Sequence, residues 1–330
     1  MANLYLTEQG AILRKTGDRL IVEKDGEVLL EVPCLKLDAV LVFGNVQFTT
    51  QAAVEMLDHG IELALLSTSG RLRGQLTPPK AKNVYLRVAQ YDLHRSGELA
   101  LGFAREVVQA KIANSAAVLR RYRENHPEAL GPEEVAALEA AGAAAAGAPS
   151  LESLLGVEGT AAARYFGLLA RTVPAELGFA GRNRRPPRDP LNALLSFGYV
   201  LVGGELQSLL DGMGYDPYIG FYHQVDYGRP SLALDLLEEL RAPLVDRFSV
   251  KLLNLGVLGA EDFTSSPQGG VYLDHDAKKR YFAAYEAELE TPFAADEGET
   301  SFRKLFRRQA ERLARALQGG EPYRAFRYPC

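Results

Sequence analysis

The sequence predicts an α+β protein, in which a small β-rich domain over residues 1–82 is followed by a larger all-α domain over residues 83–330. Short runs of alternating or β-branched residues, separated by turns that contain glycine, fill the first region and are typical of strands. From about Val84 the apolar residues recur instead at the spacing of helices. The pair Pro78-Pro79 separates the two patterns, as expected where an element ends.

The elements of the first domain follow from local patterns. The expected strands are Leu4–Leu6, Ala11–Arg14, Arg19–Glu23, Val28–Val32, Ala39–Val42 and Ile61–Leu66. Asp25-Gly26 separates the third run from the fourth, and Asp-Gly is the strongest short signal for a hairpin. Thr49 or Thr50 is suited to cap a helix that ends near Leu57, because a threonine hydroxyl accepts a hydrogen bond from an unpaired amide of the first turn.

The second domain is expected to consist of helices. The expected helices are Leu99–Arg121, Glu133–Ala146, a segment that starts near Leu151, and Leu191–Leu210. The last of these is strongly apolar and is expected near the centre of the core. The second is dominated by alanine and glutamate, and fits either a solvent-exposed helix or a low-complexity spacer.

Composition limits the class of protein. The two cysteines, Cys34 and Cys330, lie far apart and provide neither a disulfide framework nor a cysteine-rich zinc site. The first residues lack a basic segment followed by an apolar core, and no uninterrupted apolar run reaches the roughly 18 residues of a membrane span. The sequence therefore predicts a cytoplasmic protein with no membrane segment.

The charge is unevenly distributed. The net charge of −5 argues against a uniformly basic nucleic-acid coat, but arginines are concentrated in residues 182–188. Residues 303–328 are also basic, with four aromatic side chains interleaved. Such a segment is typical of one that binds phosphates and stacks on bases. It is equally typical of a solvated helix face followed by a frayed tail.

A short acidic helix is expected after His223. Asp235, Glu238 and Glu239 stand at i, i+3 and i+4, so their side chains occupy neighbouring helical positions. A divalent cation would relieve their mutual repulsion, and histidine with carboxylates suits Mg²⁺ or Mn²⁺ better than a zinc cage. The alternative is a solvated face opposite the leucines of the same helix.

Glu158 lies between Gly156 and Gly159, with few bulky polar neighbours. Small residues would let another chain segment or a phosphate backbone approach closely. The alternative is an acid near a helix start, stabilised by the helix dipole.

Three segments carry a resemblance to a known family. They are Glu158-Gly-x-x-Ala-x-x-Tyr165-Phe, Arg184-Arg185-Pro-Pro-x-Asp189-Pro-x-Asn192-Ala-Leu-Leu-Ser-Phe-Gly-Tyr199, and His223 with its acidic helix. In this order they resemble the CRISPR-associated integrase, the metal-dependent DNA endonuclease of spacer acquisition. The resemblance covers essentially the whole chain, including the order of the two domains.

The resemblance implies a metal site of Glu158, His223 and Glu238 that uses Mn²⁺ or Mg²⁺. Asp235 matches a second acid needed for activity, so the implied catalytic set is Glu158, His223, Asp235 and Glu238. Glu239 is a weaker candidate, because the family commonly has a neighbouring acid there that is not a ligand. Residues expected to hold a phosphate or nucleotide near the metal are Tyr165, Arg184 and Arg185.

The implied reaction is phosphodiester transesterification, in which the 3′-hydroxyl of a foreign DNA strand attacks a CRISPR array and a spacer is inserted. The implied substrates are double-stranded and branched DNA. The family implies a homodimer that dimerises through residues 1–82, carries its catalytic site in residues 83–330, and has two dimers bridged by a small CRISPR-associated partner of nuclease-like fold.

Other functions are compatible with parts of the sequence. The adjacent pair His275-Asp276 is shared with metal-dependent phosphohydrolases of the His-Asp type, although those need further histidines upstream. A DNA-binding scaffold with a decayed metal site is the remaining alternative, and the complete set of Glu158, His223 and Glu238 argues against it.

Overall fold

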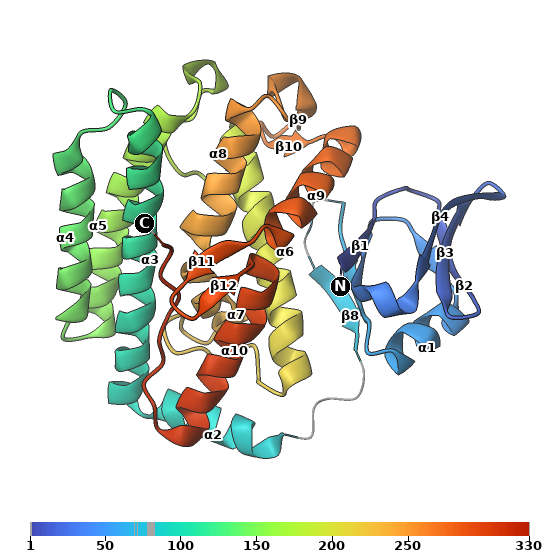
Figure 1. The fold of residues 1–330 in the computed structure, drawn as a ribbon, viewed down its shortest axis with the longest axis horizontal. Coiled ribbons are helices and arrows are strands. Elements are labelled where there is room, and N and C mark those ends of the chain that lie inside the picture. The colour runs from blue at the N-terminus through green and yellow to red at the C-terminus, as the bar shows by residue number, and fades with distance from the viewer. Residues whose placement is uncertain (1, 69, 71, 78–82, 330) are drawn as a thin grey trace.

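The computed structural model describes residues 2–68, 70, 72–77 and 83–329. A β-rich part and a larger helical part lie side by side (Figure 1), which confirms the predicted α+β class and the order of the two parts. The predicted boundary at residue 82 and the pair Pro78-Pro79 fall outside the described residues.

The β-rich part contains two four-stranded sheets. The first has the order β1-β5-β7-β8, and its strands are β1 (Ala2–Leu6), β5 (Leu37–Phe43), β7 (Glu62–Leu66) and β8 (Leu72–Leu76). The second has the order β4-β3-β2-β6, with β2 (Ile12–Thr16), β3 (Arg19–Lys24), β4 (Glu27–Pro33) and β6 (Gln47–Phe48). All six expected strands are confirmed. Strand β6 is not predictable from the sequence because it has two residues, and β8 is not because its apolar residues do not alternate clearly.

Turn and cap residues behave as their chemistry predicts. Asp25 and Gly26 have φ angles of 51° and 86°, as the turn between β3 and β4 requires. Helix α1 (Thr50–Asp58) begins after Thr49, whose hydroxyl accepts a hydrogen bond from the amide of Ala52 at 3.2 Å. Both local predictions are therefore confirmed.

The helical part is built around α6 (Pro190–Met213). The other helices are α2 (Val84–Arg95), α3 (Gly97–Asn125), α4 (Pro132–Ala146), α5 (Leu151–Leu169), α7 (Ser231–Glu238), α8 (Arg247–Asn254), α9 (His275–Glu290) and α10 (Phe302–Gly319). Single turns of 3₁₀ helix occur at Cys34–Lys36, Ala170–Thr172, Ala175–Leu177 and Ala260–Asp262, and a π-helical turn spans Arg241–Asp246. Helices α3, α4 and α5 lie side by side (Figure 1), so the Ala-rich segment is a packed helix and not a spacer.

Short hairpins correct the expectation of an all-α second domain. Strands β9 (Phe263–Ser265) and β10 (Val271–Leu273) form one antiparallel pair, and β11 (Phe293–Ala295) and β12 (Gly298–Thr300) form another. Each strand has three residues, which is too short for a period of two to be visible in the sequence.

Helix α6 is, among the described residues, a helix long and apolar enough to cross a membrane by length and composition. Buried residues make up 61% of its most apolar window. This burial is what the sequence predicted for a helix at the centre of the core.

The C-terminal tail is packed into the protein. Its aromatic side chains Tyr323, Phe326 and Tyr328 are buried. The side-chain amide of Asn114 on α3 donates to the carbonyl of Phe326 at 2.9 Å, and its oxygen accepts from the amide of Tyr328 at 2.8 Å. The aromatic residues therefore belong to the core, and both earlier interpretations of them, a base-stacking surface and a frayed tail, are wrong.

Candidate active site

The three predicted metal ligands converge from separate elements. Glu158 lies on α5, Glu238 is the last residue of α7, and His223 lies in the segment between α6 and α7. The His223 Nε2 atom is 3.5 Å from Glu238 Oε1. The ammonium of Lys111, on α3, contacts Glu158 Oε1 and lies 2.6 Å from Glu238 Oε2. Residues far apart in the sequence thus meet around one cationic group.

Glu238 is surrounded by positive charge. Its Oε1 atom is 3.2 Å from Arg241, three residues further along the chain. Burial alone would raise the pKa of Glu238, but the charges of Arg241 and Lys111 outweigh burial and hold that pKa at about 2. The carboxylate is therefore ionised and suited to a cation.

Asp235 shapes the segment that carries His223. It is fully buried, and its Oδ2 accepts hydrogen bonds from the amides of Phe221 at 2.6 Å and Tyr222 at 3.1 Å. Its Oδ1 accepts from the His223 amide at 2.8 Å and lies 2.7 Å from His223 Nδ1. Because Asp235 is an acceptor, we assign the imidazole proton to Nδ1, which leaves the lone pair of Nε2 free on the side of Glu238.

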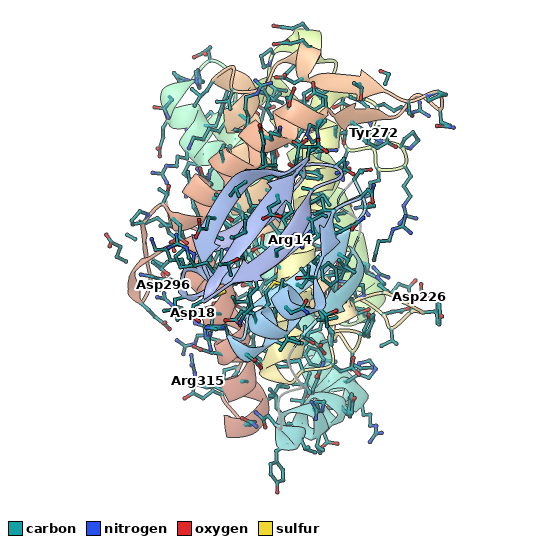
Figure 2. All side chains as sticks on the ribbon, turned by 90° about the vertical axis from the view of Figure 1, so that its right-hand side faces the viewer. Arg14, Asp18, Asp226, Tyr272, Asp296 and Arg315 are labelled. Atoms are coloured by element: carbon teal, nitrogen blue, oxygen red, sulfur yellow. The ribbon has the colours of Figure 1, made fainter. Side chains whose placement is uncertain are left out.

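Gly220 lets this segment pass directly over the start of α7. A Cβ atom at this position would lie 2.8 Å from Asp235 Oδ2 and from Ser231. Beyond His223 the chain leaves the protein body as an exposed loop, on which Asp226 projects at the edge of the molecule (Figure 2). His223 therefore lies where a rigid, Asp235-bound turn meets an exposed loop.

Glu239 faces a different part of the protein. It is buried and accepts hydrogen bonds from the Tyr323 hydroxyl at 2.6 Å, the Gln309 amide at 2.9 Å and the backbone amide of Phe326. The expectation that three acids share one face of the helix is thus wrong in detail. Asp235 binds backbone amides, Glu238 faces cations, and Glu239 anchors the C-terminal tail.

A narrow cavity of about 40 Å³ is lined by Glu158 together with Lys111 and Arg241. Its wall includes Asp246, which accepts hydrogen bonds from the hydroxyls of Tyr165 at 2.9 Å and Tyr199 at 2.6 Å. Burial raises the pKa of Asp246 to about 6, against the lowering effect of these hydroxyls and of nearby arginines. Arg241 lies over the ring of Tyr199, 4.5 Å from its centroid. These contacts fix the guanidinium of Arg241 beside Glu238.

The residues predicted to hold phosphate are distributed differently. Tyr165 lines the narrow cavity, but its buried hydroxyl is bound to Asp246. Arg184 is exposed and lines both this cavity and an adjoining one of about 940 Å³. Arg185 lines only the larger cavity. Of the two predicted arginines, Arg184 therefore shares a cavity with Glu158.

Sequence reasoning missed Lys111, Arg182 and Arg241 as parts of this site. Arg241 could have been found, since a cation three residues after an acid on a helix is a recognised pair. Arg182 belongs to the basic run of residues 182–188, and in the structure its guanidinium donates to Asn192 at 2.8 Å. Lys111 precedes Glu158 by 47 residues, and no local pattern connects them.

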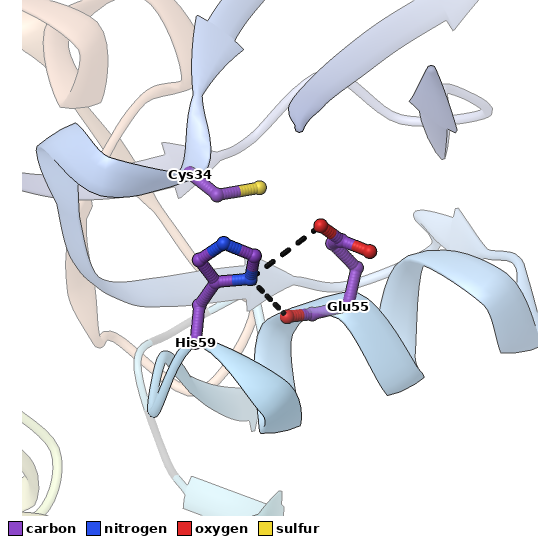
Figure 3. A group of neighbouring side chains, drawn as sticks. All are labelled: Cys34, Glu55 and His59. Atoms are coloured by element: carbon purple, nitrogen blue, oxygen red, sulfur yellow. Dashed lines mark hydrogen bonds and ion pairs between the residues drawn. The ribbon is translucent and has the colours of Figure 1, made fainter. Parts of the chain in front are cut away.

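A second group of potential metal ligands lies in the β-rich part. Ligand atoms of Cys34, Glu55 and His59 all lie within 4.8 Å of one another (Figure 3). Each already has a setting of its own: Lys15 binds Glu55, the His59 Nδ1 atom is 3.0 Å from the carbonyl oxygen of Glu55, and burial raises the pKa of the Cys34 thiol. A thiol and an imidazole suit zinc more than Mn²⁺ or Mg²⁺. This group therefore does not replace the predicted site.

The His-Asp pair of the alternative hypothesis lies elsewhere. His275 is the first residue of α9, is largely exposed, and has its Nε2 atom 3.7 Å from Glu8. The adjacent Asp276 pairs with Lys279 of its own helix. This surface setting gives no support to a phosphohydrolase centre.

Comparisons with known proteins point to one family. The model of the family described as CRISPR associated protein Cas1 matches residues 4–287. The chain is 36% identical over 331 residues to a CRISPR-associated endonuclease Cas1 of Rhodospirillum rubrum, covering 96% of this chain and 95% of the relative. It is 38% identical over 329 residues to a Cas4/Cas1 fusion of Geobacter sulfurreducens, covering 97% of this chain but 59% of that longer protein.

Solved structures show the same fold. A Cas1 protein from Thermotoga maritima superposes with a TM-score of 0.82 at 25% identity, covering 97% of each chain. A chain of a Cas6-RT-Cas1–Cas2 complex also gives a TM-score of 0.82 at 25% identity, over 99% of this chain and 36% of the other. By the family match and by its relatives, this chain belongs to the CRISPR-associated Cas1 family.

Proposed function

We propose that this chain is a metal-dependent DNA endonuclease and integrase that inserts foreign DNA spacers into a CRISPR array. The proposal uses Glu158, His223 and Glu238 as ligands of Mn²⁺ or Mg²⁺. The observation that carries it is the approach of these side chains to one another: His223 Nε2 lies 3.5 Å from Glu238 Oε1, and the ammonium of Lys111 contacts both Glu158 and Glu238. Its relatives are named CRISPR-associated endonucleases, which supports the same activity.

The donor set fits a hard divalent cation. It offers two carboxylates and one imidazole nitrogen, which suits Mn²⁺ or Mg²⁺. Glu238 Oε2 is buried, and among the described residues it has an ionic contact with Lys111 but no well-formed hydrogen bond. Glu238 Oε2 is therefore available to coordinate a metal ion.

When bound, such a cation would polarise a phosphodiester oxygen and stabilise the charge that develops on it. The protein groups would supply position. Asp235 holds His223 in the tautomer that presents Nε2, and Arg241 and Arg184 offer positive charge for a phosphate. A 3′-hydroxyl as the nucleophile gives integration, and its reversal on branched DNA gives disintegration.

The proposed partners are double-stranded and branched DNA, a second copy of this chain, and the Cas2-type protein. The edge strand β4 supports a homodimer, because Val28, Leu29 and Leu30 are 56%, 49% and 43% exposed on it. An apolar edge of this kind needs a cover. A Cas1–Cas2 assembly among the similar structures supports the third partner. We propose that the protein acts in the cytoplasm, with no membrane partner.

A direct test uses purified protein with Mn²⁺ and branched DNA. The protein should resolve branched DNA and, with the Cas2-type protein, join pre-spacer DNA to a repeat. Glu158→Ala and His223→Ala should abolish both reactions, whereas His275→Ala should not. Full activity of either site variant would contradict the site assignment, and loss in His275→Ala alone would favour the phosphohydrolase. A scaffold would show no Mn²⁺ binding that depends on His223.

A further inference from the structure

Lys111 occupies the position in which a cation is expected. Its ammonium contacts Glu158 Oε1 and lies 2.6 Å from Glu238 Oε2, so it bridges two of the three proposed ligands. We propose that Lys111 acts as the counter-ion of the resting site, and that a divalent cation binds only by displacing it. This inference rests on the metal site proposed above, and it assigns Lys111 as a positioning residue that sets the affinity of that site.

The bridge ties three helices together without metal. Lys111 comes from α3, Glu158 from α5 and Glu238 from α7. The side chains are 18%, 18% and 4% exposed, so water screens their charges only weakly. Without the ammonium the two carboxylates would repel each other, and the packing of α3, α5 and α7 would be less stable.

The position of the ammonium favours displacement over coexistence. A divalent cation held between Glu158 Oε1 and Glu238 Oε2 would take the place that the ammonium of Lys111 occupies. The ligand atoms of Glu158, His223 and Glu238 are also less closely gathered than those of the Cys34 group, since an ammonium stands between the carboxylates. Removal of the ammonium would free both the space and the oxygens.

Lys24 provides a control. Its ammonium lies 2.6 Å from Glu8 Oε1 in the β-rich part, and each of the two side chains is 33% exposed. Lys24→Met therefore removes a Lys–Glu contact from a part of the chain without the proposed catalytic ligands. Lys111→Met removes the ammonium at the site but keeps most of the side-chain volume, and Lys111→Arg keeps a cation there.

The experiment measures Mn²⁺ binding by isothermal titration and melting temperature in EDTA and in Mn²⁺. We expect Lys111→Met to bind Mn²⁺ at least about tenfold more tightly than the unchanged protein. A tenfold change in Kd corresponds to about 1.4 kcal/mol of binding free energy. Its melting temperature in EDTA should be lower than that of the unchanged protein. Added Mn²⁺ should raise its melting temperature by more than it raises that of the unchanged protein. Lys111→Arg should bind Mn²⁺ no more tightly than the unchanged protein. Lys24→Met should leave Mn²⁺ affinity unchanged.

The outcomes separate this inference from the proposed function. Equal or weaker Mn²⁺ binding by folded Lys111→Met would overturn the inference, because a lysine that merely supports the site should weaken binding when lost. Tighter binding that persists in Lys111→Met, His223→Ala would also overturn it, by placing the metal elsewhere. If the unchanged protein shows no Mn²⁺ binding that depends on His223, the proposed metal site fails instead. If Lys111→Met does not fold, Lys111→Gln is measured in its place against the same expectations.

Discussion

Glu238 and Glu239 are adjacent and almost equally buried, yet they have opposite surroundings. Glu238 faces the charged groups of Lys111 and Arg241, which hold its pKa at about 2 in spite of burial. Glu239 faces neutral donors of α10 and the C-terminal tail. Burial raises the pKa of Glu239 to about 7, because the hydrogen bonds of Tyr323, the Phe326 amide and Gln309 offset that effect only in part.

The difference shows what separates a functional acid from a structural one in this helix. Burial and residue type are the same for the two, so neither decides the role. The charge of the neighbours decides it: a carboxylate among cations stays ionised and can bind a metal ion, whereas a carboxylate among neutral donors joins segments of the fold. The predictions below test this contrast.

The largest effect is expected on catalysis. Glu238→Gln should lower Mn²⁺-dependent DNA joining by at least 10²–10³-fold, since an amide replaces a proposed charged ligand. Glu239→Gln should keep most of that activity. The measurement is the yield of joined product with the Cas2-type protein, after both variants are shown to fold by thermal melting. Equal losses in the two variants would remove the contrast.

A smaller loss is expected at Asp235, which touches the ligand His223 and not the proposed metal. Asp235→Asn should weaken Mn²⁺ binding by about 10–100-fold, the usual result when the partner of a metal-bound histidine is lost. The reason is that an amide can no longer accept all the hydrogen bonds from the turn over Phe221, Tyr222 and His223. Isothermal titration with Mn²⁺ measures the change, and unchanged affinity would show that His223 needs no such support.

Glu239→Ala should destabilise the protein without a direct effect on metal binding. It leaves the donors of Tyr323, Gln309 and Phe326 without their acceptor, and an unsatisfied buried donor costs about 1–3 kcal/mol. Urea unfolding measures the loss. Limited proteolysis should show cleavage in the tail beyond Gly320 before other sites. A variant as stable as the unchanged protein would show that the tail is held by its aromatic residues alone.

Glu239 should also make the stability of the protein depend on pH. With a pKa of about 7 in the folded protein and 4.5 as the ordinary value, folded Glu239 keeps a proton that the unfolded chain has released. Its contribution to the free energy of unfolding is therefore full below about pH 4.5 and falls as pH rises to about 7. Relative to Glu239→Gln, the unchanged protein should lose on the order of 1–3 kcal/mol over this range. Urea titrations measure the difference in the free energy of unfolding between the unchanged protein and Glu239→Gln. If this difference stays constant or grows as pH rises, the pKa of Glu239 is not raised in the folded protein.

Much of the fold could be predicted because its signals are local. The turn at Asp25-Gly26, the cap at Thr49 and the apolar pattern of α6 each depend on neighbours in the sequence. The site could be predicted only in part. Motifs in order predict Glu158, His223 and Glu238 as ligands, whereas Lys111 meets Glu158 and Glu238 only after α3, α5 and α7 pack together.

The C-terminal tail also shows a limit of prediction from the sequence. Its arginines and aromatic residues alternate as they would in a segment that grips nucleic acid. The partner that explains the aromatic residues is the buried pair of Asn114 and Glu239, which lies far away in the sequence. Composition alone therefore could not distinguish a binding tail from a packed one.

The smallest effect is expected at the outer face of α5, beside the proposed ligand Glu158. A Cβ atom added at Gly159 or at Gly167, both exposed on this helix, would have no atom within 4 Å. Alanine at either position should therefore stabilise the protein by about 0.5–1 kcal/mol through helix propensity. If a DNA backbone approaches the face next to Glu158, Gly159→Ala should also lower DNA affinity a few-fold, while Gly167→Ala should not. Fluorescence anisotropy with branched DNA measures the difference, and equal affinities would show that the glycines beside Glu158 leave room that DNA does not use.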